Sequence, residues 1–206
     1  WGGDNTYKQL NVSTSLGTVV AASVGLEHTC AINATGRLKC WGNNEDGQIN
    51  TPADIGEVVA VAAGNYYTCA LNTAGETRCW GYNYGHDEIV PLVDDLGTPH
   101  GIVASHMITC AVNTGNTVRC WGAVDYSGIS FPDELGGTLH SVSVGWDFVC
   151  VLTTAGAVRC FGSAGYNQLA VPSNLGLVAV LSSSGHHTCA MTTTSAQGTR
   201  CLHVGT

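Results

Sequence analysis

The sequence has few charged residues, and basic ones are the scarcest: 7 Lys and Arg against 15 Asp and Glu in 206 residues. The formal net charge of −8 at pH 7 cannot supply the basic surface that nucleic acids and anionic membranes require. No apolar run is long enough to span a bilayer. We therefore expect no nucleic-acid partner and no insertion into a membrane.

The motifs of common catalytic and metal sites are also missing. There is no Gly-x-Ser-x-Gly elbow, no phosphate-binding glycine loop and no Cys-x-x-Cys pair of the kind that structural zinc favours. Residues 43–47 lack the alternating acids of a calcium loop and are better explained as a turn. His28 and His187 share one repeat position that also accepts Ile108 and Phe148, which indicates packing rather than metal binding. We predict no catalytic residue, no metal and no cofactor, and hence no enzyme.

What the chain does have is ten cysteines at one repeated spacing, alongside 27 glycines. The first member of each pair recurs after 39, 41, 40 and 39 residues. The pairs are Cys30/Cys40, Cys69/Cys79, Cys110/Cys120, Cys150/Cys160 and Cys189/Cys201. They divide a single predicted domain, residues 1–206, into repeats 1–40, 41–79, 80–120, 121–160 and 161–201. A period of about 40 residues is typical of propellers and other repeat arrays.

Each cysteine pair predicts a disulfide across a β-hairpin. In the first repeat, pairing about Thr35 places Cys30 opposite Cys40 and Ile32 opposite Leu38 on one face. Five such bridges indicate an oxidising compartment and therefore a secreted protein. Each would close a loop of roughly ten residues and contribute about 2–3 kcal/mol in the chain-entropy model.

A further apolar stretch precedes each hairpin, such as residues 58–63 and 177–181. These stretches are short and rich in β-branched residues, so they predict strands. Several short strands per repeat, separated by glycine-containing turns, predict an all-β fold: a β-propeller of five blades, each crosslinked by its hairpin disulfide.

The residue before each closing cysteine is basic: Lys39, Arg78, Arg119, Arg159 and Arg200. On the same face the sequence places Trp41, Trp80, Trp121, Phe161 and Leu202, which favours a cation–π stack, with an anion-binding ring as the alternative. A second repeated position holds Ser15, Asp54, Asp95, Glu134 and Asn174. These side chains are expected to cap a turn or pair with the basic residues, or else to form an acidic surface that meets a cationic partner.

Residues 41–48 (Trp-Gly-Asn-Asn-Glu-Asp-Gly-Gln), Pro52, Gly64, residues 68–71 and Gly75 resemble the regulator of chromosome condensation type of propeller repeat. The chain is most similar to its compact secreted form, the β-lactamase inhibitor protein II-like form. The resemblance implies a β-propeller that presents loops to proteins. The paired cysteines, Phe161 and Leu202 at the aromatic position, and five repeats in place of the usual seven depart from the pattern. Trp1-Gly2 is then a surplus piece of strand that could close the ring, pair with another copy, or mark the place where a longer array was cut.

The polar and aromatic residues expected to be exposed differ most between repeats in two loops: the one after each aromatic-Gly pair and the one before each first cysteine. Tyr and Asn on a rigid frame suit protein contacts or stacking on a sugar, although they also fill turns. The candidate binding residues are Asn43, Asn44, Tyr66, Tyr82, Tyr84, His86, Tyr126, Trp146 and Tyr166. The sequons at Asn11 and Asn33, the latter in a hairpin tip, predict glycosylation in a eukaryotic secreted protein.

The predicted function is that of a secreted, non-catalytic module for protein interaction or self-assembly. Two alternatives stay open: a carbohydrate-binding lectin and an inhibitor of an extracellular enzyme. The expected partner is accordingly a protein, another copy of the chain or a glycan.

Overall fold

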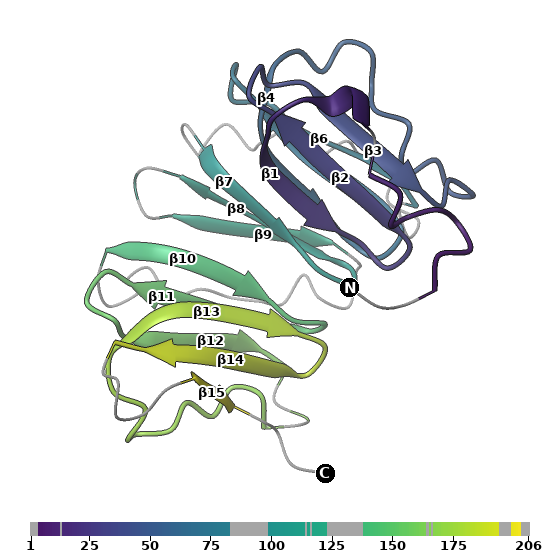
Figure 1. The fold of residues 1–206 in the computed structure, drawn as a ribbon. Coiled ribbons are helices and arrows are strands. Elements are labelled where there is room, and N and C mark those ends of the chain that lie inside the picture. Colours follow the sequence, from purple (N-terminus) through teal and green to yellow (C-terminus); the bar gives the residue numbers. More distant parts are fainter. Residues whose placement is uncertain are drawn as a thin grey trace. The chain divides into compact units, whose positions relative to one another are not determined.

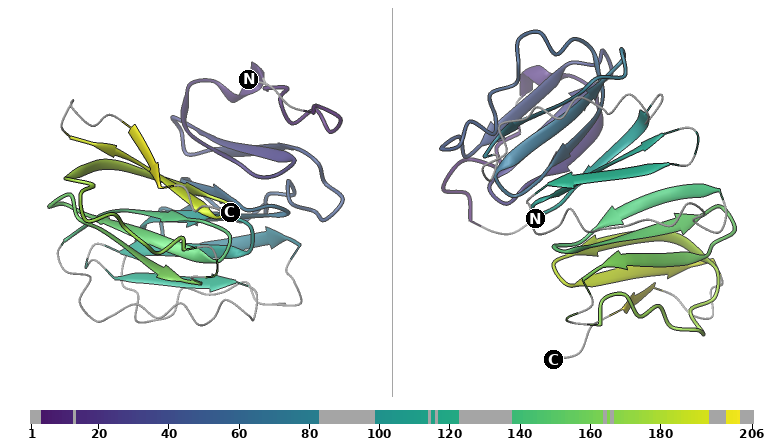
Figure 2. Two further views of the ribbon diagram at one scale, coloured as in Figure 1. Left: turned by 90° about the horizontal axis from the view of Figure 1, so that it is seen from below. Right: turned by 180° about the vertical axis from the view of Figure 1, so that it is seen from behind.

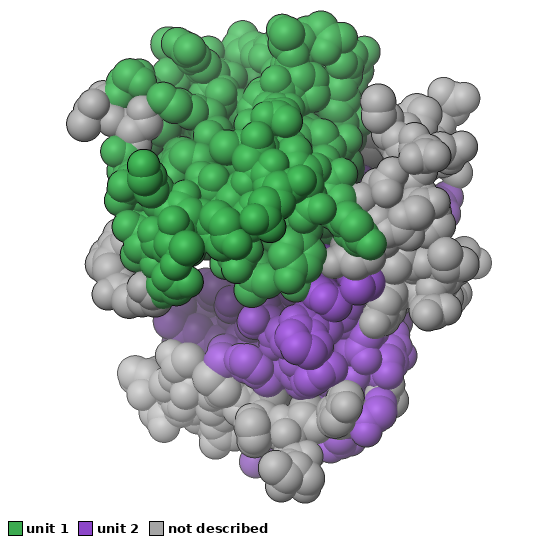
Figure 3. All heavy atoms as spheres, turned by 90° about the vertical axis from the view of Figure 1, so that its right-hand side faces the viewer, with its two compact units in different colours: residues 1–104, 111–117 green, residues 105–110, 118–206 purple. Residues whose placement is uncertain are grey.

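A computed structural model describes residues 4–12, 14–82, 99–113, 115, 117–122, 138–163, 165, 167–193 and 199–202. The chain divides into two compact units (Figure 3). Unit 1 comprises residues 1–104 and 111–117, and unit 2 comprises residues 105–110 and 118–206. No helix among the described residues is long and apolar enough to cross a membrane. The single-domain assignment of residues 1–206 stays a prediction.

The fold is all-β and built from propeller-type blades, as predicted. Each repeat forms one three-stranded antiparallel sheet whose strands lie side by side in chain order (Figure 1 and Figure 2). The first blade follows a short 3-10 helix, η1 (Thr14–Leu16). The strands of the five blades are β1 (Val19–Val24), β2 (His28–Asn33), β3 (Leu38–Gly42); β4 (Val58–Ala63), β5 (Tyr67–Asn72), β6 (Thr77–Gly81); β7 (Pro99–Ala104), β8 (Ile108–Asn113), β9 (Val118–Gly122); β10 (Leu139–Val144), β11 (Phe148–Thr153), β12 (Val158–Gly162); and β13 (Val178–Ser184), β14 (His187–Thr192), β15 (Thr199–Leu202).

The hairpin register inferred from the cysteine spacing is confirmed. Cys30 pairs with Cys40 and Ile32 with Leu38 between β2 and β3. Four disulfides form within repeats, each joining Cα atoms 4.0 Å apart: Cys30–Cys40, Cys69–Cys79, Cys110–Cys120 and Cys150–Cys160. In the fifth blade Cys189 lies opposite Cys201 in the backbone register and is disulfide-bonded, while the Cys201 side chain lies outside the described part.

Side-chain alternation gives each blade two different faces. In the first blade the cysteine face carries Cys30, Ile32 and Leu38, and the opposite face, here called the threonine face, carries Thr29 and Trp41. The cysteine face of the first blade packs against the threonine face of the second, with Ala70 in the same buried cluster as Ile32. Leu152 and Ala190 repeat this arrangement between the fourth and fifth blades. The disulfides therefore also line the core between blades.

Polar contacts fix the junction between the first two blades. The Thr68 hydroxyl donates to the Gln48 carbonyl at 2.8 Å and lies 2.9 Å from Nε2 of His28, with His28 and Thr68 both buried. Since Thr68 has one hydroxyl hydrogen, His28 must donate Nε2–H to it, which assigns the tautomer. Desolvation lowers the pKa of His28 to about 4, so the ring is neutral at pH 7. His28 is thus a packing residue, as its repeat position predicts.

Candidate functional site

The turn that joins the first and second strands of each blade carries the exposed aromatic residues of interest. A glycine opens this turn in three blades, because a Cβ at Gly25, Gly64 or Gly145 would collide with the ring three residues later. The turns of consecutive blades are hydrogen-bonded to each other. In unit 1 the Leu26 N–H donates to the Asn65 carbonyl at 3.4 Å, and in unit 2 the Trp146 N–H donates to the Gly185 carbonyl at 2.8 Å. Neighbouring turns thus present adjacent side chains.

In unit 2 these turns bring three rings together around Trp146. The Trp146 ring centroid lies 5.2 Å from that of His106 and 4.8 Å from that of His186, the latter in an edge-on arrangement. Trp146 remains 44% exposed although it contacts both neighbours. Aromatic rings in this geometry stabilise one another by about 0.5–1.5 kcal/mol. We call His106, Trp146 and His186 the tryptophan cluster.

The Asp147 carboxylate lies beside the tryptophan cluster. Asp147 accepts a hydrogen bond from Nε2 of Gln168 at 3.1 Å, and its Oδ1 lies 3.7 Å from Nδ1 of His186. Its backbone carbonyl also accepts the Ser163 N–H at 2.9 Å, which ties the turn to the strand end beyond β12. Burial lowers the pKa of His106, so this ring is uncharged at neutral pH. The cluster therefore offers an aromatic surface on a fixed backbone, with the Asp147 carboxylate beside His186.

The equivalent turns of unit 1 have different chemistry. The Tyr82 N–H donates to the Tyr66 carbonyl at 2.9 Å, so these two predicted binding residues lie next to each other, with the Tyr82 side chain exposed. Leu26 in the first blade is exposed as well. Unit 1 thus offers tyrosine and leucine where unit 2 offers tryptophan and histidine.

Asn43 and Asn44 fit the alternative in which loop side chains stabilise the turn by hydrogen bonds. The Asn43 side chain is only 3% exposed: its Nδ2 donates to Glu27 at 2.8 Å and its Oδ1 accepts the Glu45 N–H at 2.7 Å. Asn43 thus has no free surface for a partner, contrary to the expectation for an exposed loop. Asn44 is exposed and its side chain binds Asn50 across the turn. Tyr84, His86, Tyr126 and Tyr166 lie outside the described residues.

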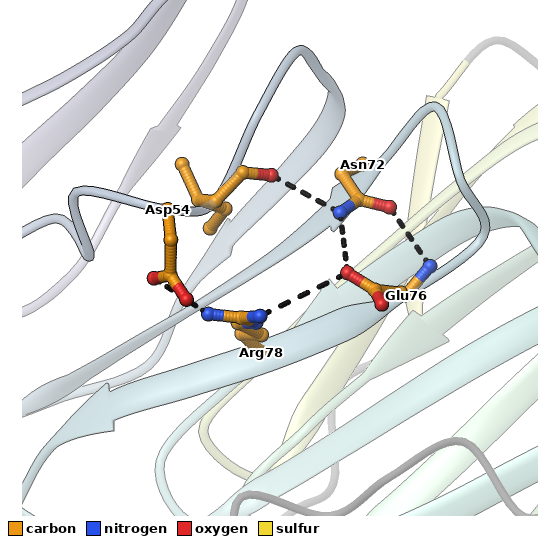
Figure 4. Close-up of polar contacts among 5 residues, drawn as sticks. Asp54, Asn72, Glu76 and Arg78 are labelled. Atoms are coloured by element: carbon orange, nitrogen blue, oxygen red, sulfur yellow. Dashed lines mark hydrogen bonds and ion pairs between the residues drawn. The ribbon is translucent and has the colours of Figure 1, made fainter.

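The predicted pairing of basic residues with the Ser/Asp position is confirmed in two blades. Arg78 contacts Oδ1 of Asp54 at 2.7 Å and Glu76 at 3.9 Å, and Asn72 binds Glu76 (Figure 4). The Arg78 guanidinium lowers the pKa of Asp54. In the first blade Nζ of Lys39 donates to Oγ of Ser15 at 3.1 Å. These contacts tie the hairpin to the preceding loop, which favours a structural role; the cation–π stack stays a prediction.

The two predicted glycosylation sites differ in their surroundings. Asn33 is half-buried: its Nδ2 donates to the Leu16 carbonyl at 2.9 Å, and its Oδ1 accepts the Arg37 N–H at 2.9 Å. Asn33 is therefore not the freely exposed tip expected from its place in the hairpin. Asn11 is exposed, and its Oδ1 accepts a hydrogen bond from Asn5. Glycosylation at either residue stays a prediction.

His106, His186 and Asp147 were not predicted as binding residues. His106 and Trp146 occupy one repeat position, four residues before the first cysteine of their pairs, so aligning the repeats could have found His106. His186 falls one position later in that alignment and joins the cluster through the turn geometry. The described residues hold no group of three or more His, Cys, Asp or Glu side chains that could bind a metal ion.

The family model that matches the chain is the regulator of chromosome condensation (RCC1) repeat, at residues 19–48, 58–85 and 139–168. These three segments are similar to RCC1-type repeats, which supports that part of the predicted resemblance. No curated protein matches the sequence. The closeness to the β-lactamase inhibitor protein II-like form stays a prediction.

Several solved structures have a similar fold. The ectodomain of the receptor kinase CR4 from Physcomitrella patens has a TM-score of 0.72 and 22% identity over 90% of this chain and 53% of that chain. The CRINKLY WD40 ectodomain of Arabidopsis thaliana ACR4 has a TM-score of 0.73 and 19% identity over 90% and 72%. Yeast RCC1 (Prp20), solved with Kap60, has a TM-score of 0.56 and 12% identity over 84% and 68%. The chain spans about half of the CR4 ectodomain, 53% of its length, and such low identities show the fold alone.

Proposed function

We propose that this chain is an extracellular, non-catalytic protein-binding module and that the tryptophan cluster is the centre of its binding surface. The observation that carries the proposal is Trp146, which stays 44% exposed while both neighbouring rings and the backbone hold it in place. Tryptophan is enriched among the residues that dominate protein-binding energies. A ring that is already ordered loses little conformational entropy when it binds.

The extracellular setting rests on the disulfides and on the type of similar structure. Four hairpin disulfides persist in oxidising compartments and are rare in the cytosol. The CR4 and ACR4 propellers are ectodomains of receptor kinases, and yeast RCC1 was solved with a protein partner. A disulfide-crosslinked β-sheet scaffold that displays variable turns is suited to binding a protein in such a setting.

Site-specific photo-crosslinking tests this proposal. A photoreactive phenylalanine analogue replaces Trp146 in one preparation and Val59 in another, since Val59 is an exposed apolar residue on β4 away from the turns. Each is mixed with extracellular material from the source organism. We expect a discrete crosslinked protein from position 146 and none from position 59. Identical products from both positions, or none from position 146, would contradict the proposal. An enzyme as the crosslinked protein would support the inhibitor alternative within the same class.

A glycan is the second candidate ligand, favoured by the three neighbouring rings. Aromatic faces stack on sugars, and Asp147 and Gln168 place polar groups beside the cluster. Trp146 fluorescence titrated with a panel of oligosaccharides would change saturably if a glycan binds there. Loss of that change in Trp146→Ala, with the response kept in Tyr82→Ala, would assign the chain to the lectins instead.

A further inference from the structure

Asp147 places a carboxylate at a fixed position in the tryptophan cluster. It directly follows Trp146, and it is the only Asp or Glu among the described residues of unit 2. The Gln168 amide donates to its Oδ1 at 3.1 Å, and Nδ1 of His186 lies 3.7 Å from the same oxygen. These two contacts orient the carboxylate through one oxygen, and neither of them uses Oδ2.

The imidazole of His186 contacts both the indole and the carboxylate. Its ring centroid lies 4.8 Å from that of Trp146, while its Nδ1 is the atom beside Oδ1 of Asp147. The backbone of both residues is held as well, because the Trp146 N–H donates to the Gly185 carbonyl and the Asp147 carbonyl accepts the Ser163 N–H. An exposed indole and a carboxylate therefore lie close together in a fixed arrangement.

The Lys and Arg residues of unit 2 occupy a different part of the blades. In the described part of the unit these residues are Arg119, Arg159 and Arg200, each directly before a closing cysteine. Arg159 pairs with Val151, whereas the turn that carries Trp146 joins the sheet at Phe148, about 10 Å along the strand. No described Lys or Arg of unit 2 therefore lies in the turns that form the cluster.

A basic side chain is the group that fits both parts of this surface. An apolar group pressed onto Trp146 would displace water from Asp147 without replacing its hydrogen bonds, which costs free energy. An acidic group would be repelled by Asp147 and by the negative face of the indole. The stem of an arginine or lysine can pack on the ring while its charged end pairs with the carboxylate.

We propose that the tryptophan cluster binds an arginine or lysine side chain of its protein partner, which lies against the Trp146 indole and pairs with the Asp147 carboxylate. The inference rests on the proposed function, because it names the chemistry of the partner at the same surface. The formal net charge of −8 favours the approach of a basic partner. The equivalent turn of unit 1 has Leu26 and Glu27 at these two positions, and therefore offers a carboxylate without an aromatic ring.

Titration of the chain with blocked tripeptides, followed by NMR, tests the inference. The probes are acetyl-Gly-Arg-Gly-amide and the same peptide with citrulline, which keeps the shape of arginine and lacks its charge. The indole N–H signal of Trp146 is assigned by its loss in Trp146→Phe. We expect the arginine peptide to shift this signal saturably at concentrations on the order of millimolar, and the citrulline peptide to bind at least about tenfold more weakly.

Two matched variants test the role of the carboxylate. Asp147→Asn keeps an oxygen for the Gln168 amide but removes the charge, and should weaken binding of the arginine peptide by about tenfold. Glu27→Gln removes the same charge at the equivalent turn of unit 1, where Glu27 accepts a hydrogen bond from Asn43, and should leave binding unchanged. Equal losses in the two variants would overturn the inference, because they would show a dependence on net charge alone.

The peptide comparison on the wild-type chain decides the matter without any variant. No saturable shift with the arginine peptide, or equal binding of the arginine and citrulline peptides, would overturn the inference. Photo-crosslinking at position 146 separates this failure from a failure of the proposed function. A discrete crosslinked partner together with equal binding of both peptides would leave the protein-binding role standing and contradict only the basic side chain.

Discussion

Replacing Thr68 with valine should reveal how much one buried hydroxyl contributes to the junction between blades. Valine keeps the shape of threonine and removes the group that donates to the Gln48 carbonyl and accepts Nε2–H of His28. The Gln48 carbonyl keeps a second donor, the Trp80 indole at 3.0 Å. The His28 N–H, in contrast, would be left buried without its acceptor.

The expected cost follows from that unpaired donor. Leaving a buried N–H unsatisfied costs about 1–3 kcal/mol, and the lost hydrogen bond to Gln48 adds about 1 kcal/mol. We expect Thr68→Val to lower the free energy of unfolding by about 2–4 kcal/mol, which is roughly 5–15 °C in Tm for a chain of this size. Denaturant unfolding measures the free energy and thermal unfolding measures Tm, both followed by circular dichroism.

A double-mutant cycle separates the cost of leaving the His28 N–H unpaired from the cost of changing the packing. The positions of His28 and Thr68 are occupied by Ile108 and Val149 at the next-but-one junction along the sequence, so the fold already accommodates an apolar pair. We expect His28→Ile combined with Thr68→Val to recover at least about 1 kcal/mol relative to the sum of the single changes. A cost below about 0.5 kcal/mol for Thr68→Val, or strictly additive effects, would refute this account of the junction.

Three further predictions use other features of the same blades. Between pH 6.5 and about 4 the unfolded chain binds a proton at His28 that the folded chain does not, so acidification should reduce the free energy of unfolding by about 3 kcal/mol more in the wild type than in His28→Phe; denaturant titrations at both pH values measure the difference. Gly145→Ala forces a Cβ into the Phe148 ring and should cost about 1–3 kcal/mol, whereas Gly101→Ala meets no atom within 4 Å and should change Tm little. Trp146→Ala should lower Tm by only a few °C, because it removes the ring contacts with His106 and His186 and no core residue, while abolishing partner binding in a pull-down; a collapse of Tm would assign the ring to the core.

Cysteine spacing was enough to predict the blade hairpins. Cys30 and Cys40 define both the turn and the face of Ile32, because side chains alternate along a strand. The link between Arg78 and Asp54 was also predictable, since both recur at fixed repeat positions. Local patterns of this kind depend on residues close in the chain, which a single repeat already contains.

The burial and the contacts of a side chain within the array could not be predicted from its repeat position. Met191 and Leu71 are equivalent in sequence, yet Met191 is exposed and Leu71 is buried, because burial depends on what packs against each strand rather than on the repeat position. Asn43 was expected on the surface, but its short amide folds back on Glu27 and Glu45. The grouping of His186 with Trp146 depends on contacts between turns of different repeats, which the sequence of one repeat does not contain.

Peptide mapping without reduction tests the central structural claim most directly, because both blade faces and the tryptophan cluster depend on the hairpin register. The account predicts Cys30–Cys40, Cys69–Cys79, Cys110–Cys120 and Cys150–Cys160, with Cys189–Cys201 as the fifth pair. A link between repeats, such as Cys40–Cys69, would contradict the blade assignment and the functional surfaces built on it.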